Sequence, residues 1–376
     1  MFAEPPSPDP VAAISTRRGS ALPRLPVLLA AMLVVAGVYA VTAIRLKPAL
    51  FPGAREEKQT SLRDSTELAN LRAVEAILSA MQQALRDGEM DKAKTIIDRA
   101  VERFPRDQAL WLARADLRYR LAYPADDTEV PEAERNGYLA EAYDSYTRAL
   151  SIGPRTPEME FSAGSIARDL GKLDAAEAHF QMAAQGDRSK AAYPLNLAQV
   201  YLTRNELDRA KAQLAVSVAL DADQPNAWGM LAEVALRQDE PRIALQHLEK
   251  AVRLEPAEPA WRHMQARAFN RIAEPQRALE SLEALPQADR FARVSLQLAG
   301  QSYGLLHRPE SALALYEEAL RSGVADPEVM LDAAVWAERL GDRRRALELA
   351  TRARAQGLQR ADEFIERLNA GTPTGG

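Results

Sequence analysis

The 376-residue sequence contains no cysteine. Disulfide bonds, thiolate metal sites and thiol nucleophiles are therefore excluded, and the compartment is left open, because a cysteine-free chain suits reducing and oxidising surroundings alike. Histidine is also scarce. The four histidines include no pair three or four positions apart, the spacing that would place two metal ligands on one helical face. We therefore expect neither a metal site nor a cofactor.

The chain also lacks a surplus of positive charge. Its net charge is −5, and the first 58 residues hold seven basic and four acidic side chains, so the remainder carries a net charge of −8. Nucleic-acid binding requires a clustered positive face, so we expect no nucleic-acid partner. Hydrophobic residues make up 47% and charged residues 27%, which is close to globular averages, so most of the chain should fold.

Catalytic patterns are nearly absent. Gly300 to Gly304 (GQSYG) matches the G-x-S-x-G pattern of a nucleophile elbow, which requires a strand before the serine and a helix after it. The periodicity described below places these residues inside one helix, where packing explains the glycines. We therefore predict no catalytic residue, no enzymatic activity and no small-molecule substrate. A hydrolase or transferase with an unmarked site is the alternative.

One long apolar run stands out near the N-terminus. Leu25 to Ile44 contains twenty residues without a charge, enough for a helix of roughly 30 Å, the thickness of a bilayer core. The sequence predicts a tail at 1–24, a transmembrane helix or signal-anchor at 25–44 and a linker at 45–58. A cleaved signal peptide remains an alternative, because Val38-Tyr39-Ala40 and Val41-Thr42-Ala43 resemble small-residue cleavage sites.

Basic residues flank this apolar run on both sides, so the positive-inside rule does not decide its orientation. A short tail that carries arginines suits the arrangement with the tail inside and the body outside. We expect a single-pass protein of a bacterial inner membrane, with the folded body on the extracytoplasmic side.

The body of the sequence is periodic. Alanines recur at regular intervals along the chain. The first interval is 49 residues and each later one is 34, at Ala93, Ala142, Ala176, Ala210, Ala244, Ala278, Ala312 and Ala346. In most cases a second alanine follows seven residues later, as in Ala244 and Ala251. Seven residues make two helical turns, so both alanines face one neighbour, where small side chains allow a close approach.

Helix breakers divide each period into two helices. In 225–258 an apolar stripe around Trp228 precedes the breaker Asp239-Glu240-Pro241, and a second stripe from Ala244 ends before Pro256. Glycines or prolines mark the same boundaries in other periods. Each period is thus predicted to be a helical hairpin, with the four tryptophans as core anchors. Trp261 stands one place ahead of the usual position.

These features resemble the tetratricopeptide repeat family, with its period of 34, a large apolar residue at position four and small residues at positions eight, twenty and twenty-seven. The predicted fold is an all-α solenoid of about eight helix-turn-helix repeats over 74–360. The repeats are framed as 74–107, 108–156, 157–190, 191–224, 225–258, 259–292, 293–326 and 327–360. A lead-in helix is expected at 59–73, a capping helix at 361–371 and a tail at 372–376.

The interval of 49 places a 15-residue insertion in the second repeat, near 123–137. It contains five acidic residues against Arg135, and Pro131 is suited to start a lengthened second helix. We favour a solvated loop, because loops accept insertions at low cost. A contact with a partner is the alternative.

The resemblance implies a superhelix whose concave groove is lined by the first helix of each repeat and binds a peptide or protein partner. Positions five, nine, twelve and thirteen carry this role in the family. Read onto this sequence, with one neighbouring asparagine, they give Asn196, Gln199, Glu233, Arg237, His263, Arg267, Asn270, Arg271, Gln297 and Gln301. The carboxylate clamp of chaperone-binding members is not expected, because Phe161 and Ser165 replace its lysine and asparagine.

Together, these observations predict a non-enzymatic, membrane-anchored scaffold or assembly factor that binds a protein or peptide. A released periplasmic or secreted binding module is the alternative, and it depends on whether the apolar segment is cleaved.

Overall fold

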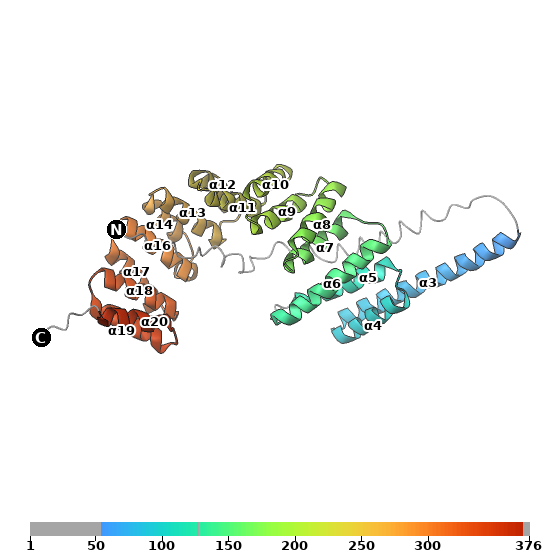
Figure 1. The fold of residues 1–376 in the computed structure, drawn as a ribbon, viewed down its shortest axis with the longest axis horizontal. Helices are drawn as coiled ribbons and strands as arrows, with labels where there is room; N and C mark the ends of the chain where they lie inside the picture. Colours follow the sequence, from blue (N-terminus) through green and yellow to red (C-terminus); the bar gives the residue numbers. More distant parts are fainter. Residues whose placement is uncertain (1–53, 126–127, 371–376) are drawn as a thin grey trace. The chain divides into compact units, whose positions relative to one another are not determined.

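The computed structural model describes residues 54–125 and 128–370, and every regular element within them is a helix (Figure 1). The predicted tail, the transmembrane segment 25–44 and the C-terminal tail 372–376 lie outside the described residues. Among the described residues, no helix combines the length and apolarity needed to cross a bilayer. The described helices belong to two compact units, the first ending at Arg188 and the second beginning at Ser189.

The N-terminal unit consists of three helical hairpins. Its helices are α3 (Ala54–Arg86), α4 (Met90–Arg103), α5 (Gln108–Ala122), α6 (Glu132–Ile152), α7 (Pro157–Asp169) and α8 (Leu173–Gly186). Helices α3, α5 and α7 are the first helices of their hairpins, and each packs against the helix that follows it. Residues 54–58, predicted as part of the linker, are helical instead, because the last helix breakers before α3 are Pro52 and Gly53.

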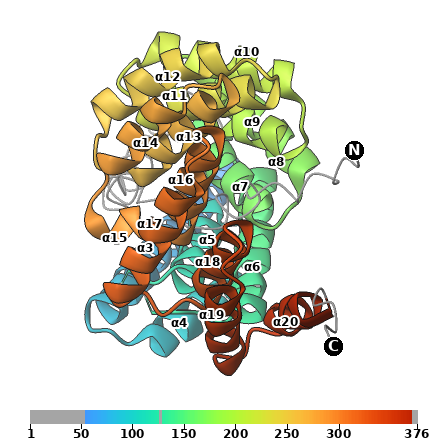
Figure 2. The same ribbon diagram turned by 90° about the vertical axis from the view of Figure 1, so that its left-hand side faces the viewer.

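The C-terminal unit continues the pattern with five hairpins and a final helix. Its helices are α9 (Ala192–Thr203), α10 (Leu207–Leu220), α11 (Pro225–Arg237), α12 (Pro241–Leu254), α13 (Pro259–Arg271), α14 (Pro275–Glu283), α15 (Gln287–Arg290), α16 (Arg293–Leu305), α17 (Pro309–Arg321), α18 (Pro327–Arg339), α19 (Arg343–Ala355) and α20 (Arg360–Ala370). Each hairpin packs against the next one along the chain (Figures 1 and 2). The predicted fold of paired helices is confirmed.

The periodic alanines form the centre of every hairpin. All eight alanines of the 34-residue series have no exposed surface. The alanines seven residues later are also buried, and where Ser217 replaces alanine its side chain is fully buried, with Oγ donating to the carbonyl of Ala191 at 3.0 Å. Each second helix therefore lies directly on its first helix through a strip of small side chains, as the spacing predicts.

The turn between the two helices of a hairpin has a constant backbone conformation. A residue with positive φ occurs at the same position of consecutive repeats, at Gly171, Asn205, Asp239, Ala273, His307 and Gly341. The residue after it donates its N–H to a carbonyl in the last turn of the first helix, as Glu240 does to Ala235 at 2.7 Å. This left-handed cap ends the helix even where no glycine marks the turn.

The insertion in the second repeat is partly helical. Helix α6 begins at Glu132, directly after Pro131, and has 21 residues, whereas α4 and α8 have 14. The residues 132–137 of the insertion therefore extend α6 rather than forming the loop favoured from the sequence. Proline at this point provides the fixed φ that suits a helix start, and the acidic residues after it favour the positive end of the helix dipole.

The sixth repeat is the least regular. Helix α14 ends at Glu283 and is followed by the short helix α15, because Pro286 interrupts the second helix. The displaced Trp261 is nevertheless buried, with 8% of its surface exposed. It lies against Gly229 of the preceding repeat, where a Cβ atom would stand 2.1 Å from Cζ3 of the indole ring.

Candidate functional site

The first helices of the C-terminal unit lie side by side. Helix α11 contacts α13, α13 contacts α16, and α16 contacts α18. All ten residues predicted for the partner groove lie on α9, α11, α13 and α16. We call the accessible side of these four helices the first-helix face.

The ten residues differ in how accessible they are. Gln199, Arg237, Arg271 and Gln301 are exposed, and Glu233, Arg267, Asn270 and Gln297 are half-buried. Asn196 and His263 are buried, with 7% and 9% of their surfaces exposed. The eight accessible residues are able to touch a partner directly, whereas the two buried ones act on the scaffold.

The buried members hold the helices in place. Asn196 Nδ2 donates to the carbonyl of Ala192 at 2.8 Å, one turn earlier in α9. His263 Nε2 lies 2.7 Å from Ser295 Oγ, which joins α13 to α16, and Ser295 Oγ donates to the carbonyl of Asp289 at 2.6 Å. The contact between His263 and Ser295 therefore helps to fix the spacing of α13 and α16, which carry exposed residues of the set.

Asn270 and Ser302 form a second bridge between α13 and α16. Asn270 Nδ2 donates to the carbonyl of Leu298 at 3.2 Å, and Ser302 Oγ lies 2.8 Å from Asn270 Oδ1. Ser302, the serine of the G-x-S-x-G match, is fully buried in the interior of α16. A helix precedes this serine within α16, so the strand that a nucleophile elbow requires is not present before it.

Two arginines of the set bind carbonyl groups at the C-terminal end of the first helix in the preceding repeat. Arg237 Nη1 donates to the carbonyl of Leu202 at 3.1 Å, and Arg271 Nη1 donates to the carbonyl of Leu236. Each accepting carbonyl is in the last turn of the preceding first helix, where carbonyls have no partner inside the helix. Arg237 also pairs with Glu233 across one turn of α11. These arginines therefore stabilise the stack as well as contributing charge to the first-helix face.

The polar row extends to α18, beyond the residues predicted from the sequence. Gln297 Nε2 donates to Asp332 Oδ2 at 3.1 Å, and Arg293 Nε lies 3.5 Å from the same oxygen. Burial raises the pKa of Asp332, and the hydrogen bond from Gln297 and the charge of Arg293 oppose that rise. Asp332 occupies position six of its repeat, so the repeat frame alone had the information to place it beside this row.

The N-terminal unit has a separate polar and aromatic cluster around α5, α6 and α7, which the sequence analysis did not predict. Tyr146 of α6 donates its hydroxyl to Asp116 Oδ1 at 2.5 Å, and burial raises the pKa of Asp116. Tyr119 is exposed and meets Tyr123 edge to face, with 5.1 Å between ring centroids. Tyr123 in turn donates to Asp169 Oδ2 at 3.3 Å. Asp116 is at position nine of its repeat, one of the groove positions of the family, so its repeat position could have identified it.

No group of three histidine, aspartate or glutamate side chains within the described residues is arranged to hold a metal ion. His179 Nδ1 lies 2.7 Å from Glu160 Oε2, and Arg155 pairs with the other oxygen of that buried carboxylate at 2.9 Å. His247, at the equivalent repeat position, stacks on Trp228. Burial lowers the pKa of His247, and the nearby Lys250 and Lys211 lower it further. Both histidines are therefore occupied by contacts within their hairpins.

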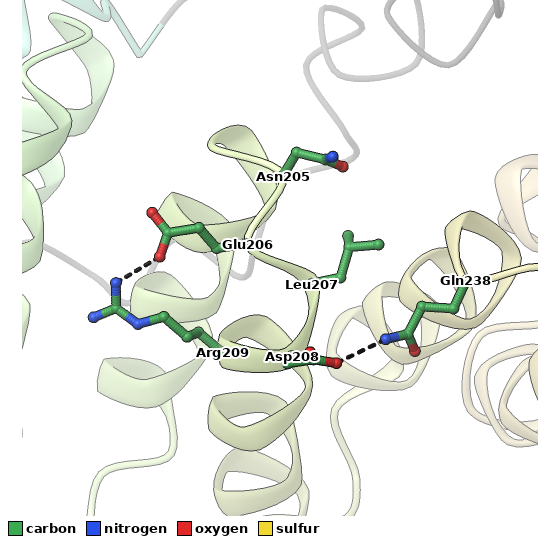
Figure 3. Close-up of a pocket in the computed structure, with 6 residues that line it drawn as sticks. All are labelled: Asn205, Glu206, Leu207, Asp208, Arg209 and Gln238. Carbon is green, nitrogen blue, oxygen red and sulfur yellow. Dashed lines mark hydrogen bonds and ion pairs between the residues drawn. The ribbon is translucent and has the colours of Figure 1, made fainter.

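A shallow depression of about 400 Å³ lies at the turn between α9 and α10. Figure 3 shows its lining, in which Arg209 reaches Glu206, and Gln238, the residue that follows α11, reaches Asp208. The distance from Gln238 Nε2 to Asp208 Oδ1 is 2.9 Å. The polar groups of the depression pair with one another, so it lacks the apolar lining and free polar groups typical of a small-molecule pocket.

Comparison with solved structures finds similar chains at low sequence identity. YrrB, described as a tetratricopeptide repeat protein with an unusual peptide-binding site, is 16% identical over 50% of this chain and 89% of its own, with a TM-score of 0.42. A tetratricopeptide repeat protein from Parabacteroides merdae is 16% identical over 68% of this chain and 97% of its own, with a TM-score of 0.47.

The C-terminal part of a repeat protein from Cytophaga hutchinsonii is 12% identical over 76% of this chain and 98% of its own, with a TM-score of 0.46. Curated protein sequences give no significant match.

Sequence profiles of the tetratricopeptide repeat match 74–117, 128–194, 167–234 and 230–293, which together cover more than half of the chain. The paired helices of the structure follow the same period through residues that the profiles do not reach, up to α19. On the repeat sequence and the stacked hairpins together, the chain belongs to the tetratricopeptide repeat family, whose members are modules for protein–protein interaction.

Proposed function

We propose that this protein is a non-enzymatic, membrane-anchored scaffold or assembly factor that binds a protein or peptide partner on the first-helix face of the C-terminal unit. The observation that carries the proposal is the row of accessible polar residues on neighbouring first helices. Gln199, Glu233, Arg267 and Gln301 recur at intervals of 34, so each is offered by a different repeat at the same height. A segment lying across the repeats would meet one polar side chain per helix.

The scaffold supports this use because the polar row rests on fixed helices. The bridges from His263 to Ser295 and from Asn270 to Ser302 hold α13 and α16 together without using the exposed side chains. Preorganised side chains lose less entropy on binding, which favours affinity from a limited number of contacts.

The test is site-specific photo-crosslinking in membranes. A photoreactive amino acid at Gln301 of the full chain should capture a defined partner, and Arg267→Glu on a neighbouring helix should abolish that capture. We choose Arg267 rather than Arg271, because Arg271 also caps α11, and its loss would weaken the stack itself.

Arg253 supplies the matched control. It is on α12, a second helix, with 72% of its side chain exposed. A photoreactive group at Arg253 should not capture the same partner, and Arg253→Glu should leave capture at Gln301 unchanged. Equal capture from both positions would contradict the assignment of the first-helix face.

Membrane anchoring rests on the apolar sequence 25–44 alone. Its test is N-terminal sequencing of the mature protein together with carbonate extraction of membranes. An intact N-terminus and retention in the membrane fraction support an anchor. A mature chain that starts near residues 40–44 would support a released periplasmic or secreted binding module instead.

A hydrolase or transferase is the competing class of function, and Ser302, the serine of the G-x-S-x-G match, is the nucleophile that such an enzyme would use. Full burial of Ser302 predicts that a serine-reactive fluorophosphonate will not label the folded protein. Labelling that disappears in Ser302→Ala would overturn the non-enzymatic assignment.

A further inference from the structure

Leu305, the last residue of α16, is an exposed apolar residue one helical turn beyond Gln301. It retains 48% of its surface, whereas its neighbours Tyr303 and Leu306 pack against the core of the C-terminal unit. A single exposed leucine is ordinary on a protein surface and has no meaning by itself. What distinguishes Leu305 is the type of residue that the other repeats have at this position.

The last residue of each described first helix in the C-terminal unit stands at position thirteen of its repeat, one of the groove positions that the family uses. All five are exposed, and four of them are polar. In chain order they are Thr203, Arg237, Arg271, Leu305 and Arg339. Among these described helices, Leu305 is therefore the one apolar member of a polar and mostly basic row.

Leucine at this position costs the fold a contact that the two preceding repeats make. Arg237 donates to the carbonyl of Leu202 at 3.1 Å, and Arg271 donates to the carbonyl of Leu236. Each acceptor stands 35 residues before its arginine, so the corresponding acceptor for position 305 is the carbonyl of Asn270. A leucine has no N–H group to donate there. A residue that gives up a stabilising contact and stays exposed is a candidate for function.

The side chains on both flanks of Leu305 are basic. Helices α13 and α18 both contact α16, so Arg271 and Arg339 end the first helices on either side of it. Packed helices lie about 8–10 Å apart, so each arginine starts about that distance from Leu305. This part of the row therefore has a basic, an apolar and a basic side chain in succession.

Two acidic residues lie beside these arginines without cancelling their charge. Glu338 pairs with Arg367 of α20 at 2.8 Å. Asp239 lies 3.9 Å from Arg271, but 91% of the aspartate side chain is exposed, and such a pair is weak in water. A guanidinium has five N–H donors, so Arg271 can hold its helix cap and bind a carboxylate of a partner as well.

These features specify the chemistry of a partner. An apolar side chain laid on Leu305 would remove both from water, which is favourable. An extended segment advances about 3.3 Å per residue, so about three residues span the distance between neighbouring first helices. A carboxylate at that separation from the apolar side chain would reach Arg271, whose planar fork matches carboxylate geometry.

We propose that Leu305 is the apolar anchor of the partner site, and that the partner is an extended protein segment in which an acidic side chain for Arg271 stands about three residues from a large apolar side chain for Leu305. The inference rests on the proposed function of the first-helix face and adds the composition of the segment bound there.

The cost of Leu305 to the fold is tested without a partner. Leu305→Arg restores the residue of the two preceding repeats, so it should raise the melting temperature of the purified full chain by about 2 °C in circular dichroism. Leu305→Ala removes only exposed surface and should leave the melting temperature nearly unchanged. A clear fall with both variants would show that Leu305 serves packing, and would overturn the proposal.

The composition of the partner is tested with a library of short random peptides displayed on phage and selected on the purified full chain. Selected peptides should share an acidic residue about three positions from a large apolar one. A synthetic peptide of this pattern should bind Leu305→Ala about tenfold more weakly than the wild type, because the apolar contact is lost. The same peptide with glutamine in place of the acid should lose a similar factor against the wild type.

Leu220→Ala is the matched control. Leu220 is also the last residue of its helix and retains 42% of its surface, but it is on α10, a second helix. This variant should bind the peptide as the wild type does, and a loss equal to that of Leu305→Ala would overturn the proposal.

Arg267→Glu separates this inference from the proposed function. Peptides that Arg267→Glu no longer binds but Leu305→Ala binds normally would leave the first-helix face as the partner site and overturn the role of Leu305. Peptides that bind both variants normally, or a library that yields no binder, would contradict the inference and the proposed site together.

Discussion

At the scale of single residues, the turns between paired helices combine one backbone conformation with different side chains. Gly171 and Gly341 have φ of 70° and 76°, values that glycine adopts freely. Ala273 has φ of 56° at the same repeat position. Alanine has no side chain that can hydrogen-bond locally and compensate for the left-handed conformation, as asparagine or aspartate can, so it carries the steric cost of that conformation alone.

Ala273→Gly should therefore stabilise the C-terminal unit by about 1 kcal/mol, because it removes the left-handed penalty, which exceeds the extra unfolded-state entropy of glycine. Thermal denaturation followed by circular dichroism measures the change. Gly341→Ala is the reverse experiment and should destabilise by a similar amount. A fall in melting temperature for Ala273→Gly would show that the turn is not under this strain.

A second residue-scale effect concerns contact between glycine and tryptophan in neighbouring repeats. A Cβ atom on Gly229 would stand 2.1 Å from the indole of Trp261, whereas one on Gly304 would stand at an ordinary 3.4 Å from the indole of Trp336. Gly229→Ala should cost about 1–3 kcal/mol through overpacking. Gly304→Ala should be neutral or stabilising, because alanine is the better helix former. Chemical denaturation of the two variants under one set of conditions tests the contrast, and equal losses would contradict it.

The residues that could be predicted from the sequence are those whose role repeats. The buried alanines share one environment in every hairpin, so their spacing of 34 residues was sufficient to predict their burial. The cap from Arg271 to Leu236 and the bridge from His263 to Ser295 join different repeats through particular side chains. Spacing places such residues on a face but does not show whether they point to solvent or to a neighbouring helix. For that reason Asn196 and His263 were assigned to the accessible row although both are buried.

At the scale of elements, the carboxyl group of Asp116 joins α5 to α6 through Tyr146, and its burial disfavours the charged form. Tyr146 donates to its carboxylate, but burial raises the pKa of Asp116 in the folded protein, and neither Tyr146 nor the charge of Arg120 fully offsets that effect. The folded state therefore holds the proton more tightly than the unfolded state. The stabilising contribution is present below the usual pKa of the carboxyl group and is lost as pH rises through the raised folded pKa.

Asp116→Asn should remove this pH dependence while keeping an oxygen that accepts the hydrogen bond from Tyr146. At neutral pH the variant should be more stable than the wild type by about 1 kcal/mol, the size of an ordinary single substitution. The difference should shrink as pH falls toward the usual carboxyl range. Paired melting curves from pH 4 to 7 measure it, and a difference that does not change with pH would exclude Asp116 as its source.

Element boundaries were predictable where proline marks them and not where the turn is made by other residues. Prolines start α7, α11, α13 and α18 at the predicted repeat boundaries. Pro131 likewise starts the extended α6, but its helical insertion was expected as a loop, because acidic residues are common in both. The cap at Ala273 depends on a positive φ that an alanine side chain does not indicate.

At the scale of the whole molecule, stability is expected to be local. Within each unit, a hairpin packs mainly against its sequence neighbours, so the unit gains stability from nearest-neighbour interfaces rather than from one shared core. Helix α20 closes the C-terminal end, where Ala361, Phe364 and Leu368 are buried in one cluster with residues of α18 and α19. A substitution in α20 should therefore lower the stability of the last hairpin most, and its effect should decrease toward earlier repeats.

Phe364→Ala tests this expectation. Loss of the ring leaves a cavity beside α19, and it should lower the stability of the last hairpin by about 2 kcal/mol or more. Hydrogen–deuterium exchange followed by mass spectrometry should show faster exchange in α18, α19 and α20, with protection in α5 to α8 unchanged. Glu366→Ala, an exposed change on the same helix, is the control and should leave all segments as in the wild type. If exchange accelerated equally in α5 to α8, the chain would unfold as one cooperative body, and the nearest-neighbour description of its stability would be wrong.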